Sequence, residues 1–370
     1  MKILLVTNKA KTYALGFKIV LESMGQLNHE IVWAADFSGF VGNKEEIPCK
    51  TVQISIHSNP LKPCNFGALR QLCKIIKEEN IDAIQCSTPI GGMLGRLAGR
   101  IKGVKKIIYA AHGFLFFEGA PLINSTIYKW QERVMARWTD VLITITEEDY
   151  RAAQKFTLRG LQKRYLVHGA GVEVGKQVVV DRAEKRKELN VPADAFVITS
   201  AGFLNKNKNN RVIIEALGKL QNPNIYYLVC GEGEERNALQ VLAERNGVTE
   251  NVRFLGYRTD LPEIMACADL FAMPSFREGV PRALLEAMDL GLPCIGSRTR
   301  GITELLDNGA GGILCDPRSA DDYARGIDAL YADSERRSEM GQQNRKMVQV
   351  YSKERVREEL LSIYTEVLTE

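Results

Sequence analysis

The sequence predicts an α/β protein of two domains, each built on a parallel β-sheet that helices cover. The chain has 370 residues, which is more than a single hydrophobic core usually supports, so two domains are expected. Short apolar runs that are typical of strands alternate with helical patterns, and this order occurs twice along the chain. Such alternation indicates parallel sheets, because a helix carries the chain from each strand back to the start of the next.

The first half contains six apolar runs with the length and composition of buried strands. Helical patterns lie between several of them, for example at Phe66–Glu79 and Met93–Ile101. The six runs are Ile3–Val6, Ile31–Ala34, Val52–Ile56, Ala83–Cys86, Lys106–Ala110 and Val141–Ile145. The second half repeats the order with Phe196–Ala201, Tyr226–Cys230, Val252–Leu255, Leu270–Met273, Cys294–Gly296 and Gly312–Leu314.

The domain boundary is expected near residue 168. The segment Gly169–Asn190 has few apolar residues and contains the charged run DRAEKRKELN, so we interpret it as the linker region that opens the second domain. The first domain then spans residues 1–168 and the second spans 169–351. A last helix is predicted at Ser352–Leu368, after a polar stretch.

Composition places the chain among soluble globular proteins of a reducing compartment. Hydrophobic residues make up 45% and charged residues 25% of the chain, as in an ordinary globular domain. No apolar run approaches the roughly 20 residues that span a bilayer, and the run in MKILLVTNKAK is too short for a signal peptide. The eight cysteines include no C-x-x-C pair. This pattern argues against a metal site or disulfide framework and predicts a cytoplasmic location.

The charge is distributed unevenly between the two halves. Residues 1–170 contain 23 Lys and Arg against 14 Asp and Glu, whereas residues 171–370 contain 26 against 31. A basic half joined to an acidic half indicates that the first half faces something anionic.

The segment SFREGVPRALLEAMDLGLP, at residues 275–293, carries the most informative pattern. A buried strand is predicted to end before Pro274, and Pro281 is expected in the first turn of the helix that follows, where a proline costs little. Glu278 then lies in the loop and Glu286 about one turn into the helix. The amides of Gly279 and Val280 between them suit a phosphate or sugar hydroxyls. The sequence therefore predicts a nucleotide-sugar site at this strand end.

The same segment matches the E-x7-E signature of retaining glycosyltransferases and resembles family 4 of these enzymes. The resemblance implies the GT-B fold, in which two Rossmann-like domains with parallel sheets face a central cleft, and a last helix that returns to the first domain. It further implies that Glu278 contacts hydroxyls of the donor sugar, that Glu286 holds the ribose, and that Gly279, Val280 and Pro281 bind the donor. The alternative is an ordinary surface helix with a solvated Glu286.

A second motif, SAGFLNKNKN, follows the first predicted strand of the second domain. Gly202 lets the backbone approach a phosphate, and a lysine six residues later can neutralise it. The motif is similar to the G-R-L-x-x-x-K segment that grips the donor diphosphate in the family, which places Lys208 at the family lysine. Phe203 replaces the family arginine, so either Lys206 or another cation compensates. Arg258, in LGYRTDLPEIMACAD, resembles the family position whose backbone lies beside the nucleobase.

The third motif is YAAHGFLFFEGAP at Tyr109–Pro121. A histidine before a glycine at a strand end is expected to face a crevice. The motif resembles the H-G segment of the family, which implies that His112 reaches the donor sugar near the reacting carbon. Its continuation resembles bacterial exopolysaccharide and capsule transferases of this family and is expected to form an acceptor-side loop in which Glu118 is a candidate polar contact.

The segment IYKWQERVMARW, at Ile127–Trp138, combines basic and aromatic residues on one predicted helix. Lys129, Trp130, Arg133 and Arg137 suit an anionic lipid surface. Equally, the aromatic side chains could pack inward while the charges face water.

The motifs and the resemblance together imply a retaining, metal-independent transferase. It is expected to move a hexose or N-acetylhexosamine from a nucleotide-diphospho-sugar, with a UDP-sugar favoured, to a glycan or polyprenyl-linked acceptor. No cofactor or nucleic-acid partner is expected. No metal is expected either, because no Asp-x-Asp motif stands at a strand end. Two alternatives remain open: a GT-B epimerase acting on UDP-sugars, and a catalytically weakened subunit that binds nucleotide-sugars. The first lacks a complete set of acid and base residues, and the second would explain Phe203.

Overall fold

The fold is described from a computed structural model that covers residues 1–10, 17–57, 59–60, 62–306 and 309–368. Residues 11–16, within the segment 8–16 that the sequence suggests as an N-terminal loop, lie outside this description. The chain forms two compact units. Unit 1 comprises residues 1–171 and 353–370, and unit 2 comprises residues 172–352.

Unit 1 is built on a seven-stranded parallel sheet of order β3-β2-β1-β4-β5-β6-β7. Alternate residues of β1 face opposite sides: Leu4 and Val6 join one hydrophobic core, and Ile3 and Leu5 join the other. This is the period of two that a strand buried on both faces requires. The strands are β1 Lys2–Lys9, β2 Glu30–Asp36, β3 Lys50–Gln53, β4 Ala83–Ser87, β5 Lys106–Ala111, β6 Val141–Thr144 and β7 Lys163–Leu166.

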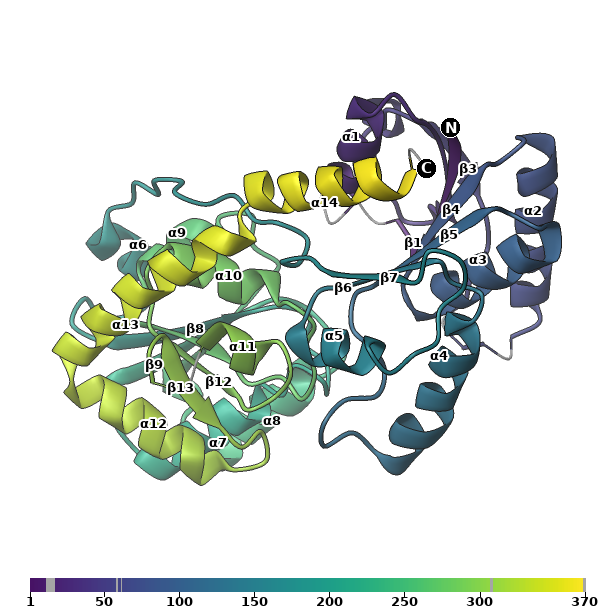
Figure 1. Cartoon of the computed structure of the whole chain (residues 1–370). Helices are drawn as coiled ribbons and strands as arrows, with labels where there is room; N and C mark the ends of the chain where they lie inside the picture. The colour runs from purple at the N-terminus through teal and green to yellow at the C-terminus, as the bar shows by residue number, and fades with distance from the viewer. Residues whose placement is uncertain (11–16, 58, 61, 307–308, 369–370) are drawn as a thin grey trace. The chain divides into compact units, whose positions relative to one another are not determined.

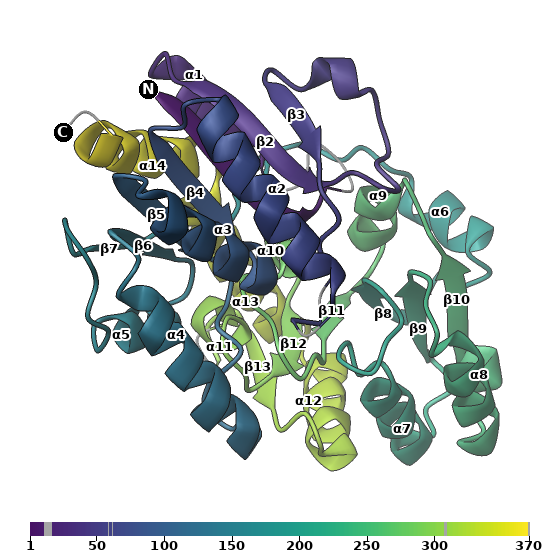
Figure 2. The ribbon, with the colours of Figure 1, turned by 90° about the vertical axis from the view of Figure 1, so that its right-hand side faces the viewer.

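Helices cover both faces of this sheet. On one face α1 (Lys18–Gln26) lies beside the last helix, α14 (Lys353–Leu368) (Figure 1). On the other face α2 (Cys64–Glu78) and α3 (Pro89–Lys102) run side by side (Figure 2). After β5 come a π-helical turn, η2 (Asn124–Tyr128), then α4 (Lys129–Ala136), and α5 (Glu147–Ala153) follows β6.

A buried ion pair fixes α4 to the rest of unit 1. Arg96 of α3, which is 1% exposed, donates from Nη1 to Oε2 of Glu132 in α4 at 2.8 Å. Its guanidinium carbon also lies 3.9 Å from the ring centre of Tyr109. Gly92 makes room for that ring, because a Cβ there would come within 2.4 Å of it. The inward face of α4 is therefore set by Glu132, and the opposite face points away from the sheet.

Unit 2 contains a six-stranded parallel sheet of order β10-β9-β8-β11-β12-β13. Neighbouring residues of β8 again serve two cores, with Val197 on one face and Ile198 on the other. Helices α7, α8 and α12 pack below the sheet in Figure 2. The strands are β8 Phe196–Ala201, β9 Ile225–Cys230, β10 Val252–Gly256, β11 Leu270–Met273, β12 Cys294–Ser297 and β13 Gly312–Cys315. The helices are α6 Arg182–Glu188, α7 Arg211–Leu220, α8 Arg236–Arg245, α9 Leu261–Ala266, α10 Arg282–Asp289, α11 Ile302–Leu306, α12 Ala320–Ala332 and α13 Ser334–Met347.

Three local predictions differ from the structure. The third strand is Lys50–Gln53, earlier than the predicted Val52–Ile56, and β7 was not predicted. The charged run in the expected linker is a helix, α6, whose N-cap Asp181 accepts from the amides of residues 183 and 184. Arg186 is buried there and donates to the carbonyls of residues 193, 195 and 267 and to the carboxylate of Asp269. The run is polar in sequence but is part of the fold, because carbonyl groups and a carboxylate of unit 2 bind the buried guanidinium of Arg186.

Candidate functional site

Two loops at the carboxyl edge of the unit 2 sheet interlock. The loop after β8 and the loop after β11 exchange hydrogen bonds: the amide of Phe276 donates to the carbonyl of Asn207 at 2.8 Å. The side-chain amide of Asn207 donates in return to the carbonyl of Arg277 at 3.0 Å. Asn209, which is buried, donates to the carbonyl of Pro274 at 3.1 Å. These bonds hold the two loops as one surface.

This interlocking brings together Lys208 and Glu278, which are 70 residues apart in the sequence. Nζ of Lys208 lies 2.8 Å from Oε1 of Glu278. The side chains are 23% and 13% exposed, so both charges are largely shielded from water while still reachable from it. Gly202 lies against the lysine: its φ is +151°, and a Cβ there would sit 3.1 Å from Cε of Lys208. A larger residue at 202 would press on the lysine side chain.

The Glu278 loop is supported by the loop that connects β12 to α11. Arg300, which is buried, donates from Nε to the carbonyl of Glu278 at 3.3 Å. Gly301, with φ of +79°, approaches so closely that a Cβ would fall 1.6 Å from the carbonyl oxygen of Gly279. Among the described residues no acceptor is recorded for the amides of Gly279 and Val280. Two backbone N–H groups without an acceptor therefore stand next to the Lys208–Glu278 pair. They lie at the start of α10, where a helix favours anions.

The remaining residues predicted around this edge are placed differently. Pro281 is the N-cap of α10, one residue before the helix, rather than within its first turn. Glu286, on α10, pairs with Nε of Arg282 at 2.7 Å and does not join the Lys208–Glu278 pair. Lys206 is exposed and has no partner among the described residues.

An apolar pocket of about 210 Å³ opens between the carboxyl ends of three neighbouring strands, β8, β9 and β10. Two aromatic side chains that contribute to its lining, Phe203 and Tyr257, are 63% and 82% exposed. Exposed rings beside an apolar hollow suit a planar ring, which can stack on them. Sequence reasoning missed Tyr257, although an aromatic residue beside a strand end was visible. The pocket is lined by Ala201, Gly202, Phe203, Cys230, Gly231, Glu232, Tyr257, Arg258 and Leu261.

Arg258 contributes to the lining of this pocket, and its guanidinium is engaged in ion pairs. Its guanidinium donates from Nε to Asp260 at 2.7 Å and from Nη2 to Glu188 at 2.8 Å. The hydrogen bond from Arg258 holds the pKa of the Asp260 carboxyl well below its usual range. The cluster stays charged and paired, so it stiffens the wall of the pocket.

In unit 1, His112 directly follows β5 at the carboxyl edge of that sheet, and its side chain is exposed. Its ring centre lies 6.1 Å from that of Phe17. The loop beyond it is anchored by stacked Phe114 and Phe116, whose ring centres are 4.9 Å apart. Glu118 is exposed on this loop, and its amide donates to Oε1 of Glu148 at 2.8 Å.

Residues 122–130, which run through η2 into α4, expose apolar side chains. Trp130 is 68% exposed, so it does not pack inward, and Lys129 lies with Nζ 5.9 Å from the ring centre of Phe116. Arg133 and Arg137 are exposed further along α4. The apolar residues exposed here with Trp130 are Leu122 at 84%, Ile123 at 55% and Ile127 at 56%.

Within the described ranges, no group of three or more His, Cys, Asp or Glu side chains is arranged to hold a metal ion. None of the helices in this part of the chain is long and apolar enough to cross a membrane.

Comparison with known proteins gives consistent matches to both units. Residues 20–164 match the family described as Glycosyltransferase Family 4, and residues 181–347 match Glycosyl transferases group 1. EpsD of Bacillus subtilis (strain 168), named as a glycosyltransferase, is 35% identical over 323 residues, which cover 84% of each chain. The UDP-Gal:alpha-D-GlcNAc-diphosphoundecaprenol alpha-1,3-galactosyltransferase of Escherichia coli is 29% identical, over 71% of this chain and 70% of that protein.

Solved structures agree on the fold. HepE of Anabaena, crystallised in complex with UDP and glucose, superposes with a TM-score of 0.79 at 19% identity, over 99% of this chain and 100% of that one. At this level of identity the likeness concerns the architecture, which is GT-B. The family matches and the relationship to EpsD over most of both chains settle the classification: the protein is a GT-B glycosyltransferase that belongs to glycosyltransferase family 4.

Proposed function

We propose that the protein transfers a hexose or N-acetylhexosamine, with retention of anomeric configuration, from a UDP-sugar to a glycan or lipid-linked acceptor. One observation carries this proposal: a lysine, a carboxylate and two unoccupied backbone amides share one strand edge, at Lys208, Glu278, Gly279 and Val280. The cation and amides suit a diphosphate, and the carboxylate suits sugar hydroxyls.

The nucleotide end of the donor is assigned to unit 2. The apolar pocket beside Phe203 and Tyr257 takes the base, and the backbone of Arg258 is assigned to its edge on the strength of the family resemblance. Glu286 takes the ribose hydroxyls, for which it must leave its ion pair with Arg282. HepE has been crystallised with UDP, and the Escherichia coli relative is named for UDP-Gal, which favours uridine as the base.

In the proposed reaction the acceptor oxygen bonds to the anomeric carbon as the bond from that carbon to the diphosphate breaks. The acceptor attacks from the face that the diphosphate leaves, and the acceptor proton passes to a diphosphate oxygen. Lys208 and the amides stabilise the charge on the leaving diphosphate, and Glu278 holds the ring as it becomes electron-poor. No metal takes part in this scheme. His112 is assigned to the donor sugar near the reacting carbon, on the strength of the family resemblance.

The replacement of the family arginine by Phe203 is compatible with an active enzyme. Phe203 lines the base pocket, so the position contributes stacking area rather than charge. Lys206, exposed on the same loop without a partner among the described residues, can supply a second cation. This counts against the alternative of a weakened binding subunit.

The acceptor is proposed to be lipid-linked, and the protein to act at the cytoplasmic face of a membrane. The exposed apolar face of η2 and α4, followed by Arg133 and Arg137, has the character of a helix that lies in the bilayer interface. The Escherichia coli relative is named for an acceptor carried on diphosphoundecaprenol.

Product analysis tests the function. The protein is incubated with UDP-glucose, UDP-galactose or their N-acetylamino counterparts, first alone and then with a lipid-linked monosaccharide. Without acceptor, we expect slow hydrolysis of one of these UDP-sugars. With acceptor, we expect the same α-linked UDP-sugar to give an α-linked product, which NMR identifies. Formation of an epimeric UDP-sugar would support the epimerase, and no turnover of any donor would support a binding subunit.

A further inference from the structure

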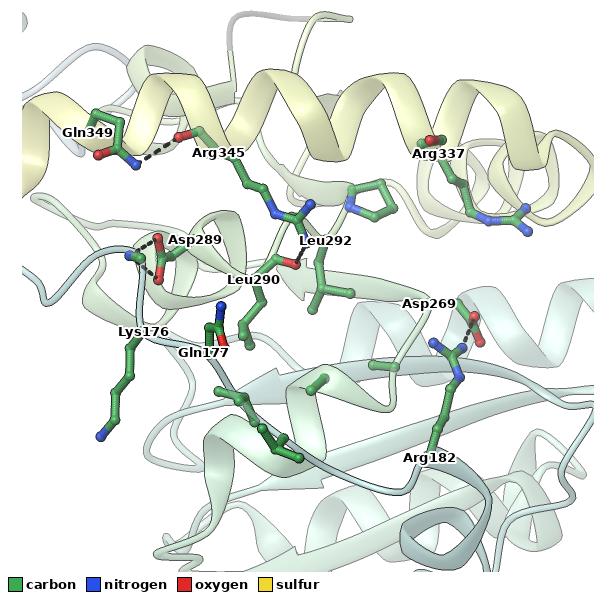
Figure 3. A pocket seen from close by; sticks show the side chains of 18 residues that line it. Lys176, Gln177, Arg182, Asp269, Asp289, Leu290, Leu292, Arg337, Arg345 and Gln349 are labelled. Atoms are coloured by element: carbon green, nitrogen blue, oxygen red, sulfur yellow. Dashed lines mark hydrogen bonds and ion pairs between the residues drawn. The ribbon is translucent and has the colours of Figure 1, made fainter.

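A second cavity lies at the opposite edge of the unit 2 sheet. Its volume is about 740 Å³, and Figure 3 shows the side chains that line it. Asp269 and Pro293, which line it, directly precede β11 and β12, whereas the Lys208–Glu278 pair lies in loops that follow strands. The cavity is therefore separated, by the length of the strands, from the carboxyl edge of the sheet where the donor is proposed to bind.

Four cationic side chains from three segments line this cavity: Lys176 from the loop before α6, Arg182 from α6, and Arg337 and Arg345 from α13. Only two carboxylates share the lining, Asp269 and Asp289. Asp269 is already paired with Arg182 and with Arg186, and Asp289 accepts the amide of Gly175 at 2.9 Å. The lining therefore carries an excess of positive charge.

Two of these arginines are held in place by neutral groups. Arg345 donates from Nη2 to the carbonyl of Leu290 at 2.8 Å. Arg337 donates to the carbonyl of Tyr331 at 3.1 Å, and its guanidinium carbon lies 5.2 Å from the ring centre of Phe196. In the described part of the chain no carboxylate lies within ion-pair distance of Lys176, Arg337 or Arg345. Their charges are available to a ligand.

The backbone is shaped to accommodate Arg345. Gly291 has φ of +73°, and a Cβ at this residue would lie 2.5 Å from Nε of Arg345. The glycine thus lets the guanidinium of Arg345 lie directly against the main chain at Gly291, beside the cavity (Figure 3). A guanidinium is always charged, and its planar donor fork matches phosphate oxygens.

We propose that this cavity is a second binding site, for a soluble small molecule that bears two or more phosphate groups. Its volume lies in the range of roughly 300–1,000 Å³ that is usual for small-molecule sites. Because it lies at the other edge of the sheet, its ligand does not compete with the donor. The proposal does not depend on the identity of the donor sugar or on the proposed reaction.

The cavity also borders both chain crossings between the units. Gly175 lies three residues after Val172, the first residue of unit 2, and Gln349 lies three residues before Ser352, the last. The amide of Val172 donates to the carbonyl of Tyr351 at 3.0 Å. A ligand in this cavity contacts the segments that lead into both crossings, which is the position of an effector.

Inorganic pyrophosphate is the probe for the test, by calorimetric titration of the full chain. Saturating UDP is added first, to occupy the proposed donor site at the carboxyl edge of the sheet. If UDP does not bind, the titration is carried out in a Lys208→Gln background instead. The test of the cavity therefore holds even if the donor site has been assigned wrongly. We expect saturable binding by the wild type, weakened at least tenfold in Arg337→Gln/Arg345→Gln. The matched control is Arg336→Gln/Lys346→Gln, which removes the same charge from α13 outside the cavity and should bind as the wild type does.

Lys176→Glu supplies a second measurement that does not disturb the packing of α13, since this lysine is on an exposed loop. It should weaken pyrophosphate binding at least as much as loss of one arginine. No binding by the wild type, or equal binding by the wild type and the cavity variants, would overturn the proposal.

Discussion

Lys208 and Glu278 form an ion pair between two loops of unit 2, with Nζ of the lysine 2.8 Å from Oε1 of the glutamate. Both side chains are largely shielded, and the amides of Gly279 and Val280 stand beside them. In this arrangement each charge satisfies the other. A diphosphate offers the lysine a stronger partner, and the carboxylate is then free to turn toward sugar hydroxyls.

The first prediction follows for Glu278→Gln. An amide can keep hydrogen bonds to hydroxyls but cannot stabilise the positive charge that develops on the sugar ring. The variant should therefore lower kcat more than it raises the donor KM. Steady-state kinetics with the accepted donor measure both. Glu244→Gln, at an exposed residue of α8, is the control, and near-full turnover by Glu278→Gln would remove Glu278 from the reaction.

The second prediction concerns Phe203. If its ring stacks on the base, Phe203→Ala should weaken UDP binding by about 1–3 kcal/mol, the range for loss of one base-stacking ring, with kcat little changed. Phe203→Tyr keeps a ring and should bind UDP nearly as the wild type does.

Phe203→Arg distinguishes two explanations for Phe203: that its ring stacks on the base, or that the enzyme has lost a catalytic positive charge at this position. We expect it to bind UDP more weakly than the wild type, without a gain in kcat. A large increase in kcat would instead show that the phenylalanine marks a weakened enzyme.

The third prediction concerns metal. Lys208 and backbone amides are assigned to the diphosphate, so transfer should continue in excess EDTA at an unchanged rate. Activity that disappears with EDTA and returns with Mn²⁺ would contradict the proposed charge stabilisation. The same assay with Lys208→Gln, which should lose most activity in either condition, shows whether the lysine supplies the cation.

The fourth prediction concerns α4. Each basic residue near an anionic membrane contributes about 1 kcal/mol, and salt weakens the attraction. Replacing Lys129, Arg133 and Arg137 by Gln should thus cost about 3 kcal/mol, more than a hundredfold in partitioning to anionic liposomes. Co-sedimentation at low and high salt measures this. A triple Gln variant at Lys62, Lys74 and Lys77 removes equal charge from another exposed part of unit 1.

The apolar half of that surface has its own control. Trp130→Ala should weaken binding at high salt, where the charges are screened, because the ring contributes buried area in the interface. If all variants sediment with the liposomes as the wild type does, the exposed face of η2 and α4 does not bind lipid.

Most strands were predictable because each is a short apolar run buried on both faces. The exceptions have physical reasons. β7 (Lys163–Leu166) is half-buried and contains Lys163 and Arg164, so no apolar run marks it. In β3 the apolar Ile54 and Ile56 are buried beyond the end of the strand, which drew the prediction toward them. The sequence predicts a linker where α6 lies, because the pairing of Arg186 with Asp269 depends on a residue 83 positions away.

The site was predictable to the extent that its parts are local. Strand ends followed by Gly202 or by the Glu278 loop are visible in the sequence, but the distance between Lys208 and Glu278 is set by bonds between loops 70 residues apart. The role of Phe203 in lining a pocket depends on three strand ends at once. The second cavity was not predicted, because its arginines belong to segments that show no shared motif.

Unit 2 is a single continuous stretch, residues 172–352, whereas unit 1 needs α14 from beyond it. Val356, Leu360 and Tyr364 of that helix complete the core on the Ile3 and Leu5 face of the first sheet. During synthesis the chain emerges from the ribosome in sequence order, and compact units fold as their residues become available. The unit whose synthesis begins second can thus finish folding first, while the earlier sheet keeps one apolar face incompletely covered until the last helix appears.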